Sequence, residues 1–170
     1  MPVFIKETAK TDSDDGLGNP CGPYRAILFS DSGGLTQFGA FEEILPPGAS
    51  SSVKHWHVGE DEMVYVLQGE VTLYEGDESV VMRSGDAATF KAGVPIGHCL
   101  KNRSNTEARC LVIGTRSSVD VVTIPITIAF CISTELQNSA AGQIILALLL
   151  IASTRSTDRS HRHRRTDTER

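Results

Sequence analysis

The residues with the clearest chemical potential are two histidines one residue apart, in the segment His55-Trp56-His57. In a β-strand, residues i and i+2 point to the same face, so both imidazoles project together while Trp56 points the other way. Two neutral imidazoles on one face form a chelating pair for a transition-metal ion. An HxH segment alone is a weak signal, because polar edge strands also contain histidines.

Two further residues strengthen the interpretation of a metal site. Glu62 follows at the start of an apolar run, where a neighbouring strand can bring its carboxylate beside the histidines. His98 opens another short run, and alternation puts its ring on the face of Leu100. If the chain closes so that this face meets that of His55 and His57, three imidazoles and one carboxylate converge. The alternative for His98 is a turn-capping or core histidine.

Other polar residues have weaker claims to the site. Glu60 is the serious rival carboxylate, since alternation from Glu62 puts it on the same side and Asp61 on the opposite side. His161 and His163 form a second HxH, but the arginines around them repel a cation. No metal is assigned to that second pair.

The elements that must position these residues are short β-type runs separated by turn residues. The expected strands cover residues 24–29, 35–45, 63–67, 70–74, 79–82, 87–90, 98–101, 108–115 and 120–124. Turn signals such as Pro46-Pro47-Gly48 and Glu75-Gly76-Asp77 separate them. This pattern predicts an all-β sandwich or barrel, without a credible helix among the strands.

The spacing of these residues resembles that in the cupin superfamily, which has two motifs. Each motif contains metal ligands flanked by glycines. The first motif is matched by Gly48, His55, His57, Glu62 and Gly69, with a spacer before the first histidine one residue longer than usual. The second is matched by Gly85, Gly93, His98 and Asn102, with Lys91 where a proline is expected and a gap from Gly93 to His98 that is two residues longer.

The resemblance implies a double-stranded β-helix, or jelly-roll, with a metal in the mouth of the barrel and often a homodimer. The implied ligands are His55, His57, Glu62 and His98. This donor set suits a divalent ion such as Fe, Mn, Ni, Co or Zn, and in octahedral geometry it leaves two positions for water or substrate. The implied partner is therefore a small-molecule ligand or substrate.

Three functions are compatible with such a barrel. The first is a metal-dependent isomerase, lyase or dioxygenase acting on a sugar acid, keto acid or phenolic compound. The second is a non-catalytic module that binds or senses a small ligand. The third, a structural storage-type cupin, is disfavoured because such proteins usually lack the metal ligands. The fold alone does not choose among them.

Composition and charge limit the partners and the domain organisation. The 170 residues carry a net charge of -5, which argues against nucleic-acid and anionic-membrane binding. Residues 1–10 show no secretory signal, so a cytoplasmic location follows by default. We expect an N-terminal arm with little regular structure at 1–23, the barrel with its metal site at 24–125, and an atypical, poorly ordered tail at 126–170.

The tail differs in composition from the rest of the chain. An apolar run at 144–152 precedes an arginine-rich end, and the run is too short for a helix to cross a bilayer. A tail anchor is also disfavoured because it would carry the arginines across the membrane. We expect residues 126–170 to be foreign to the fold, as a frameshifted or misjoined coding sequence would make them.

Overall fold

A computed structural model describes residue 3 and residues 5–125 of the chain. The predictions for residues 126–170, both their poor order and their foreign origin, lie outside the described residues. Within the described part, no helix is both long and apolar enough to cross a membrane. All four predicted metal ligands lie inside it.

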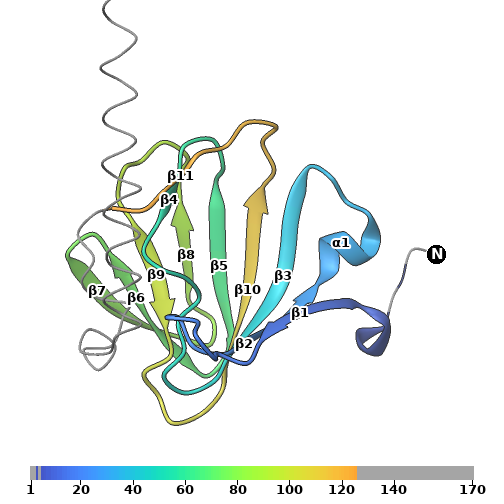
Figure 1. Ribbon diagram of the computed structural model, residues 1–170, viewed down its shortest axis with the longest axis horizontal. Coiled ribbons are helices and arrows are strands. Elements are labelled where there is room, and N and C mark those ends of the chain that lie inside the picture. The colour runs from blue at the N-terminus through green and yellow to red at the C-terminus, as the bar shows by residue number, and fades with distance from the viewer. Residues whose placement is uncertain (1–2, 4, 126–170) are drawn as a thin grey trace, which may run out of the picture. The chain divides into compact units, whose positions relative to one another are not determined.

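The larger sheet has six strands with antiparallel pairing throughout, in the order β1-β2-β3-β10-β5-β8 (Figure 1). The strands are β1 (Lys10–Asp14), β2 (Tyr24–Leu28), β3 (Phe38–Leu45), β10 (Ala108–Thr115), β5 (Glu62–Gln68) and β8 (Ala87–Phe90). Because β5 lies between β10 and β8, Glu62 at its first position is held on both sides by neighbouring strands.

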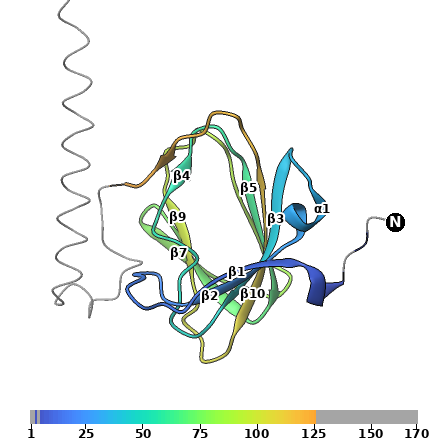
Figure 2. The same ribbon diagram turned by 45° about the vertical axis from the view of Figure 1, so that its right-hand side comes forward.

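The smaller sheet has three strands, in the order β7-β6-β9, and faces the larger sheet (Figure 2). Its strands are β7 (Glu78–Arg83), β6 (Glu70–Glu75) and β9 (His98–Lys101). A separate two-stranded pair joins β4 (Trp56–His57) to β11 (Val122–Thr123). The all-β jelly-roll barrel predicted from the sequence is confirmed.

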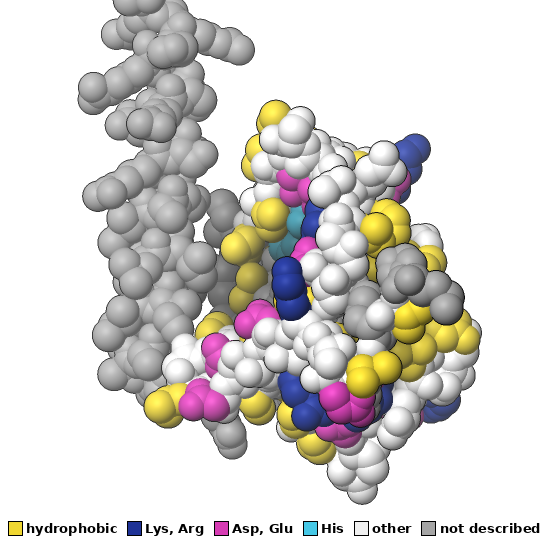
Figure 3. Space-filling view, turned by 90° about the vertical axis from the view of Figure 1, so that its right-hand side faces the viewer, with side chains coloured by type: hydrophobic (Ala, Val, Ile, Leu, Met, Phe, Trp, Pro, Cys, Tyr) yellow, Lys and Arg dark blue, Asp and Glu magenta, His cyan; other side chains and the backbone are white. Residues whose placement is uncertain are grey.

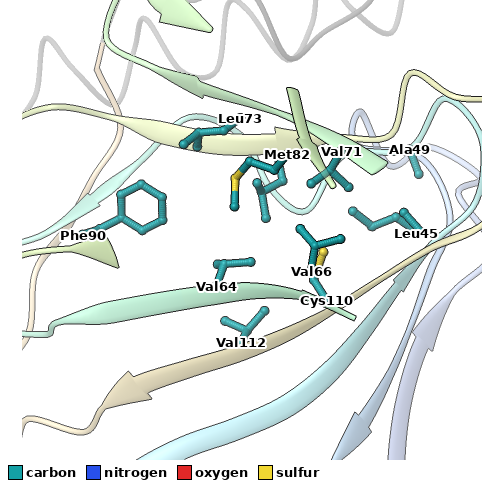
Figure 4. Packing of buried hydrophobic residues seen from close by; sticks show 12 residues of the cluster. Leu45, Ala49, Val64, Val66, Val71, Leu73, Met82, Phe90, Cys110 and Val112 are labelled. Atoms are coloured by element: carbon teal, nitrogen blue, oxygen red, sulfur yellow. The ribbon is translucent and has the colours of Figure 1, made fainter. Parts of the chain in front are cut away.

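The hydrophobic core fills the space between the sheets and draws side chains from both (Figure 4). The alternation along β5 shows how the sequence specifies it, because Val64 and Val66 are buried while Tyr65 and Leu67 between and after them are exposed. The cluster comprises Leu45, Ala49, Val64, Val66, Val71, Leu73, Met82, Phe90, Leu100, Ala108, Cys110 and Val112.

Three short elements differ from the expectations. Residues 1–23 contain a 3-10 helix (Lys6–Thr8) and the strand β1, which pairs with β2 over five residues. Every residue of β1 is exposed, so the strand is held by backbone hydrogen bonds and has no apolar alternation that would reveal it. A five-residue helix, α1 (Phe29–Gly33), also occupies the region expected to be a simple turn before β3.

Candidate metal centre

A direct backbone pairing brings His55 and His98 together. The amide of His55 donates to the carbonyl of His98 at 3.1 Å, and the amide of His98 donates to the carbonyl of His55 at 2.9 Å. Residues that exchange both hydrogen bonds in an antiparallel pair stand directly opposite and share a face. Their ring centroids accordingly lie 5.0 Å apart.

His57 extends this pair along β4. Its ring centroid lies 5.0 Å from that of His55, with the two rings nearly perpendicular at 82°. The i and i+2 spacing therefore brings the two imidazoles together, as alternation along a strand predicts. Three histidines thus come from two segments far apart in the sequence.

Glu62 reaches the histidines from the larger sheet. It lies opposite Phe90 in the pairing of β5 with β8, and the ring of Phe90 stacks on that of His98 with centroids 3.6 Å apart. Glu62 Oε1 lies 3.6 Å from His98 Nε2, and Oε2 lies 3.9 Å from His57 Nε2. Ligand atoms of His55, Glu62 and His98 all lie within 4.8 Å of one another, a spacing that can hold a metal ion.

Contacts outside this cluster fix the protonation of two imidazoles. His55 Nδ1 lies 3.0 Å from the carbonyl oxygen of Val53, which only accepts hydrogen bonds, so Nδ1 carries the proton and Nε2 keeps a lone pair. His57 Nδ1 lies 2.7 Å from Asp120 Oδ2, which selects the same tautomer. Such contacts orient metal-binding histidines and raise their basicity.

Asp120 was not among the predicted site residues. It lies 63 positions from His57 along the chain, and its Oδ1 also accepts a hydrogen bond from the amide of Gly59 at 2.8 Å. The hydrogen bond from His57 and then that from Gly59 hold the pKa of Asp120 below its ordinary value. The carboxylate is thus ionised at neutral pH, the form that best polarises an imidazole.

His98 provides the test of whether these residues fit a metal. The side chain is only 4% exposed, and within the described residues neither ring nitrogen has a hydrogen-bond partner. The 3.6 Å to Glu62 is too long for a hydrogen bond. Leaving a buried polar atom without a hydrogen-bond partner costs about 1–3 kcal/mol, so binding of a ligand to His98 Nε2 is favoured. A divalent ion beside Glu62 meets that need.

The charge states of the cluster also suit metal binding. Burial lowers the pKa of His55, which keeps its ring neutral near pH 7. Burial alone would raise the pKa of Glu62, but its interactions with His98, His55 and His57 outweigh burial and hold it below its ordinary value. Neutral imidazoles with an ionised carboxylate are the forms that coordinate metals.

Glu60, the rival carboxylate, is grouped with His57 and Asp120, and Glu62 is grouped with His55 and His98. Its Oε1 accepts a hydrogen bond from the amide of Ser117 at 2.7 Å. Ligand atoms of His57, Glu60 and Asp120 form a second group within 4.8 Å, separate from the group of His55 and His98. Glu60 is therefore close to Asp120 and is not part of the group formed by His55, Glu62 and His98.

A cavity of about 480 Å³ extends from the site into the barrel and is lined by His57, Glu62, Glu43 and Phe41, among others. Histidine side chains are visible between acidic ones on the face shown in Figure 3. Glu43 was not among the predicted site residues. It is only 6% exposed, and burial, together with the charge of Glu62, raises its pKa to about 7.

Comparisons with known proteins agree with this architecture. The sequence is 33% identical over 69 residues to an oxalate-binding protein of Thermotoga maritima, and this alignment covers 41% of the chain and 54% of the relative. The chain therefore spans about half the length of that protein.

Two solved structures cover more of the fold. One is the crystal structure of a sugar phosphate isomerase of the cupin superfamily from Silicibacter pomeroyi. It superposes on this chain with a TM-score of 0.68 at 32% sequence identity, and the match covers 72% of this chain and 81% of that one. A second structure, from Acidithiobacillus ferrooxidans, superposes with a TM-score of 0.66 at 28% identity, over 73% and 81%. Residues 41–114 match the family described as the Cupin domain. Together with the 32% identity to the Silicibacter pomeroyi structure, this match shows that the chain belongs to the cupin superfamily.

Proposed function

We propose that the protein is a metal-binding cupin that acts on a small organic substrate through His55, His57, Glu62 and His98. The observation that carries the proposal is the buried ring of His98, whose nitrogens lack hydrogen-bond partners within the described residues. The carboxylate of Glu62 lies 3.6 Å from its Nε2 atom. His55 and His57 use their Nδ1 atoms in hydrogen bonds, so their Nε2 atoms remain available to bind a metal. The donor set suits Fe, Mn, Ni, Co or Zn.

The chain's own residues define what such a site does to a substrate. A divalent ion bound there supplies Lewis acidity toward a carbonyl, carboxylate or hydroxyl oxygen. Asp120 holds His57 in one tautomer, and Phe90 stacked on His98 limits its rotation. The substrate classes are a sugar acid, a keto acid or a phenolic compound. The similarity to a sugar phosphate isomerase favours the oxygen-rich members, with isomerisation ahead of lyase or dioxygenase chemistry.

A non-catalytic binding module is the second candidate. The observation in its favour is the similarity to an oxalate-binding protein. A metal ion held by Glu62 and the histidines would then bind an anion without turnover. Assays of sugar isomerisation and oxygen uptake on metal-loaded protein separate the two, because the second candidate predicts tight ligand binding and no product.

Elemental analysis of purified protein tests the proposal directly. We expect about one equivalent of a divalent metal per chain, lost in His98→Ala. The matched control is the double variant H161A/H163A, which removes the other HxH of the sequence and should keep the metal. Metal that disappears with the control and survives in His98→Ala would refute the proposed ligands.

The proposal includes a homodimer in the cytoplasm that binds a small molecule and neither nucleic acid nor membrane. These parts rest on the sequence, through the cupin resemblance and the net charge of -5. Analytical ultracentrifugation of the full chain measures the oligomeric state. A monomer at micromolar concentration would overturn the dimer without affecting the metal site.

A further inference from the structure

Two adjacent glutamates of β3 have opposite environments. Glu42 points to the outer face of the larger sheet, where its Oε1 accepts a hydrogen bond from Arg109 Nη1 at 2.8 Å. Glu43 points into the barrel, and within residues 5–125 its carboxylate has no hydrogen bond and no ion pair. A buried carboxyl without a partner is costly, so its presence calls for an explanation.

The strands on either side of Glu43 provide no partner for it. In the sheet register it lies opposite Ala26 of β2 and Cys110 of β10, whose side chains offer at most a weak donor. The carboxyl lines the same 480 Å³ cavity as His57 and Glu62. Its oxygens are not fully enclosed, unlike the nitrogens of His98, so a molecule in the cavity can reach them.

The ionisable groups that act on Glu43 do not neutralise it. Glu62 on β5 is acidic, while Cys110 on β10, Cys21 and Tyr24 are groups whose own pKa Glu43 raises. Burial is the main reason that the pKa of Glu43 is raised to about 7. Near neutral pH the carboxyl therefore exists in both forms, as a hydrogen-bond donor and as an acceptor.

The charge of the cavity limits what can bind next to Glu43. Glu60 and Glu62 also line the cavity, and Arg116 on the same lining is already paired with Asp31 at 2.5 Å. A second anionic group on the ligand would meet repulsion there, whereas a hydroxyl both donates and accepts. A cavity of this volume also accommodates a ligand considerably larger than oxalate.

We infer, building on the proposed metal site, that Glu43 hydrogen-bonds a hydroxyl group at the end of the ligand away from the metal ligands. The ligand class is then a hydroxy acid of the sugar-acid type, with its acidic end toward Glu62 and the histidines. Oxalate, which has no hydroxyl and is short, binds without help from Glu43. Glu43 is a specificity-determining residue in this assignment.

Isothermal titration of metal-loaded protein with gluconate and with oxalate tests the assignment. We expect Glu43→Ala to weaken gluconate binding about tenfold, as loss of one hydrogen bond to a carboxyl does, and to change oxalate binding by less than about twofold. Glu43→Gln keeps a donor and an acceptor, so it should retain gluconate binding and remove its pH dependence around neutrality. The matched control is Glu42→Gln, which should change neither affinity.

The outcomes are separable because metal content is measured on every sample. Equal losses for gluconate and oxalate in Glu43→Ala, an equal effect of Glu42→Gln, or no gluconate binding by metal-loaded wild type would each overturn the role of Glu43. Absence of metal from the wild type would instead refute the proposed function. If Glu43→Ala does not fold, the isosteric Glu43→Gln decides through its pH profile.

Discussion

The interior of the barrel has an apolar end and a polar end. At one end Leu45, Val66, Ala108 and Cys110 are completely buried and apolar or weakly polar. At the other end His98 is nearly as buried, yet its two nitrogens have no hydrogen-bond partner in the described part of the chain. The apolar end gains stability from burial, while the buried nitrogens of His98 cost stability because they lack hydrogen bonds.

The boundary between these ends falls within a single strand. Glu43 and Leu45 are two residues apart on the same face of β3, and one lines the cavity while the other is in the core. Folding and ligand binding should therefore respond to different substitutions only a few ångströms apart along the backbone. Substitutions and metal addition at either end therefore test whether the two ends are independent.

Leu45→Ala should have the largest effect on stability. Truncating a fully buried leucine costs about 2–5 kcal/mol through lost apolar contact and the cavity that remains. Urea unfolding of the metal-free protein measures the loss. Metal affinity of the fraction that stays folded should not change, and a large drop would show that the two ends are coupled.

Metal addition should stabilise the wild type through the polar end alone. At a free metal concentration 100 times Kd, the free energy of unfolding should rise by about 2.7 kcal/mol. Thermal unfolding with and without metal measures this rise. The same addition should leave Tm unchanged in His98→Ala, and an equal shift in that variant would place the ion elsewhere.

Asp120→Asn should weaken metal binding without removing it. The amide no longer accepts a full charge-assisted hydrogen bond from His57 Nδ1, and loss of such a contact typically lowers metal affinity about 10–100-fold. Competition with a chelator measures the change. Asp86→Asn is the matched control, because that carboxylate accepts a hydrogen bond from the amide of Arg83 and none from a histidine, and it should keep wild-type affinity.

Glu43→Gln should change the pH dependence of stability in the metal-free protein. The folded-state pKa of Glu43 is raised from 4.5 to about 7, so its contribution is fully present below pH 4.5 and is lost as the pH rises through 7. Glutamine has no charge to bury, so the variant should be more stable than wild type by up to about 3 kcal/mol at pH 8. Near pH 4 the two proteins should unfold alike, and a constant difference across this range would contradict the assignment.

Most strands could be predicted from the sequence because their apolar alternation is local. The runs at 98–101 and 108–115 match β9 and β10 residue for residue. β1 could not be predicted in this way, because it is an exposed edge strand whose pairing with β2 leaves no trace in its own hydropathy. The jelly-roll class followed from the number of short strands and their turns.

The candidate site could be predicted to the extent that the spacing of its residues is local or follows the cupin motifs. His55 and His57 are related by strand alternation, and Glu62 and His98 by the motifs. Glu43 differs from Glu42 only in the face it occupies, and that face depends on the pairing with β10. Only the pairing of strands in the closed barrel determines which of the two glutamates points inward, and no local feature of the sequence encodes that pairing.

The mutual hydrogen bonds between the main chains of His55 and His98 have a temporal consequence. His98 emerges from the ribosome well after His55. The two residues can pair only once β9, which begins at His98, has been synthesised and has folded against the segment of His55. Nascent chains that end before His98 would lack one of the proposed ligands. If the proposed site holds a metal, its binding should follow the completion of the fold, and metal supplied during refolding should speed none of the earlier steps.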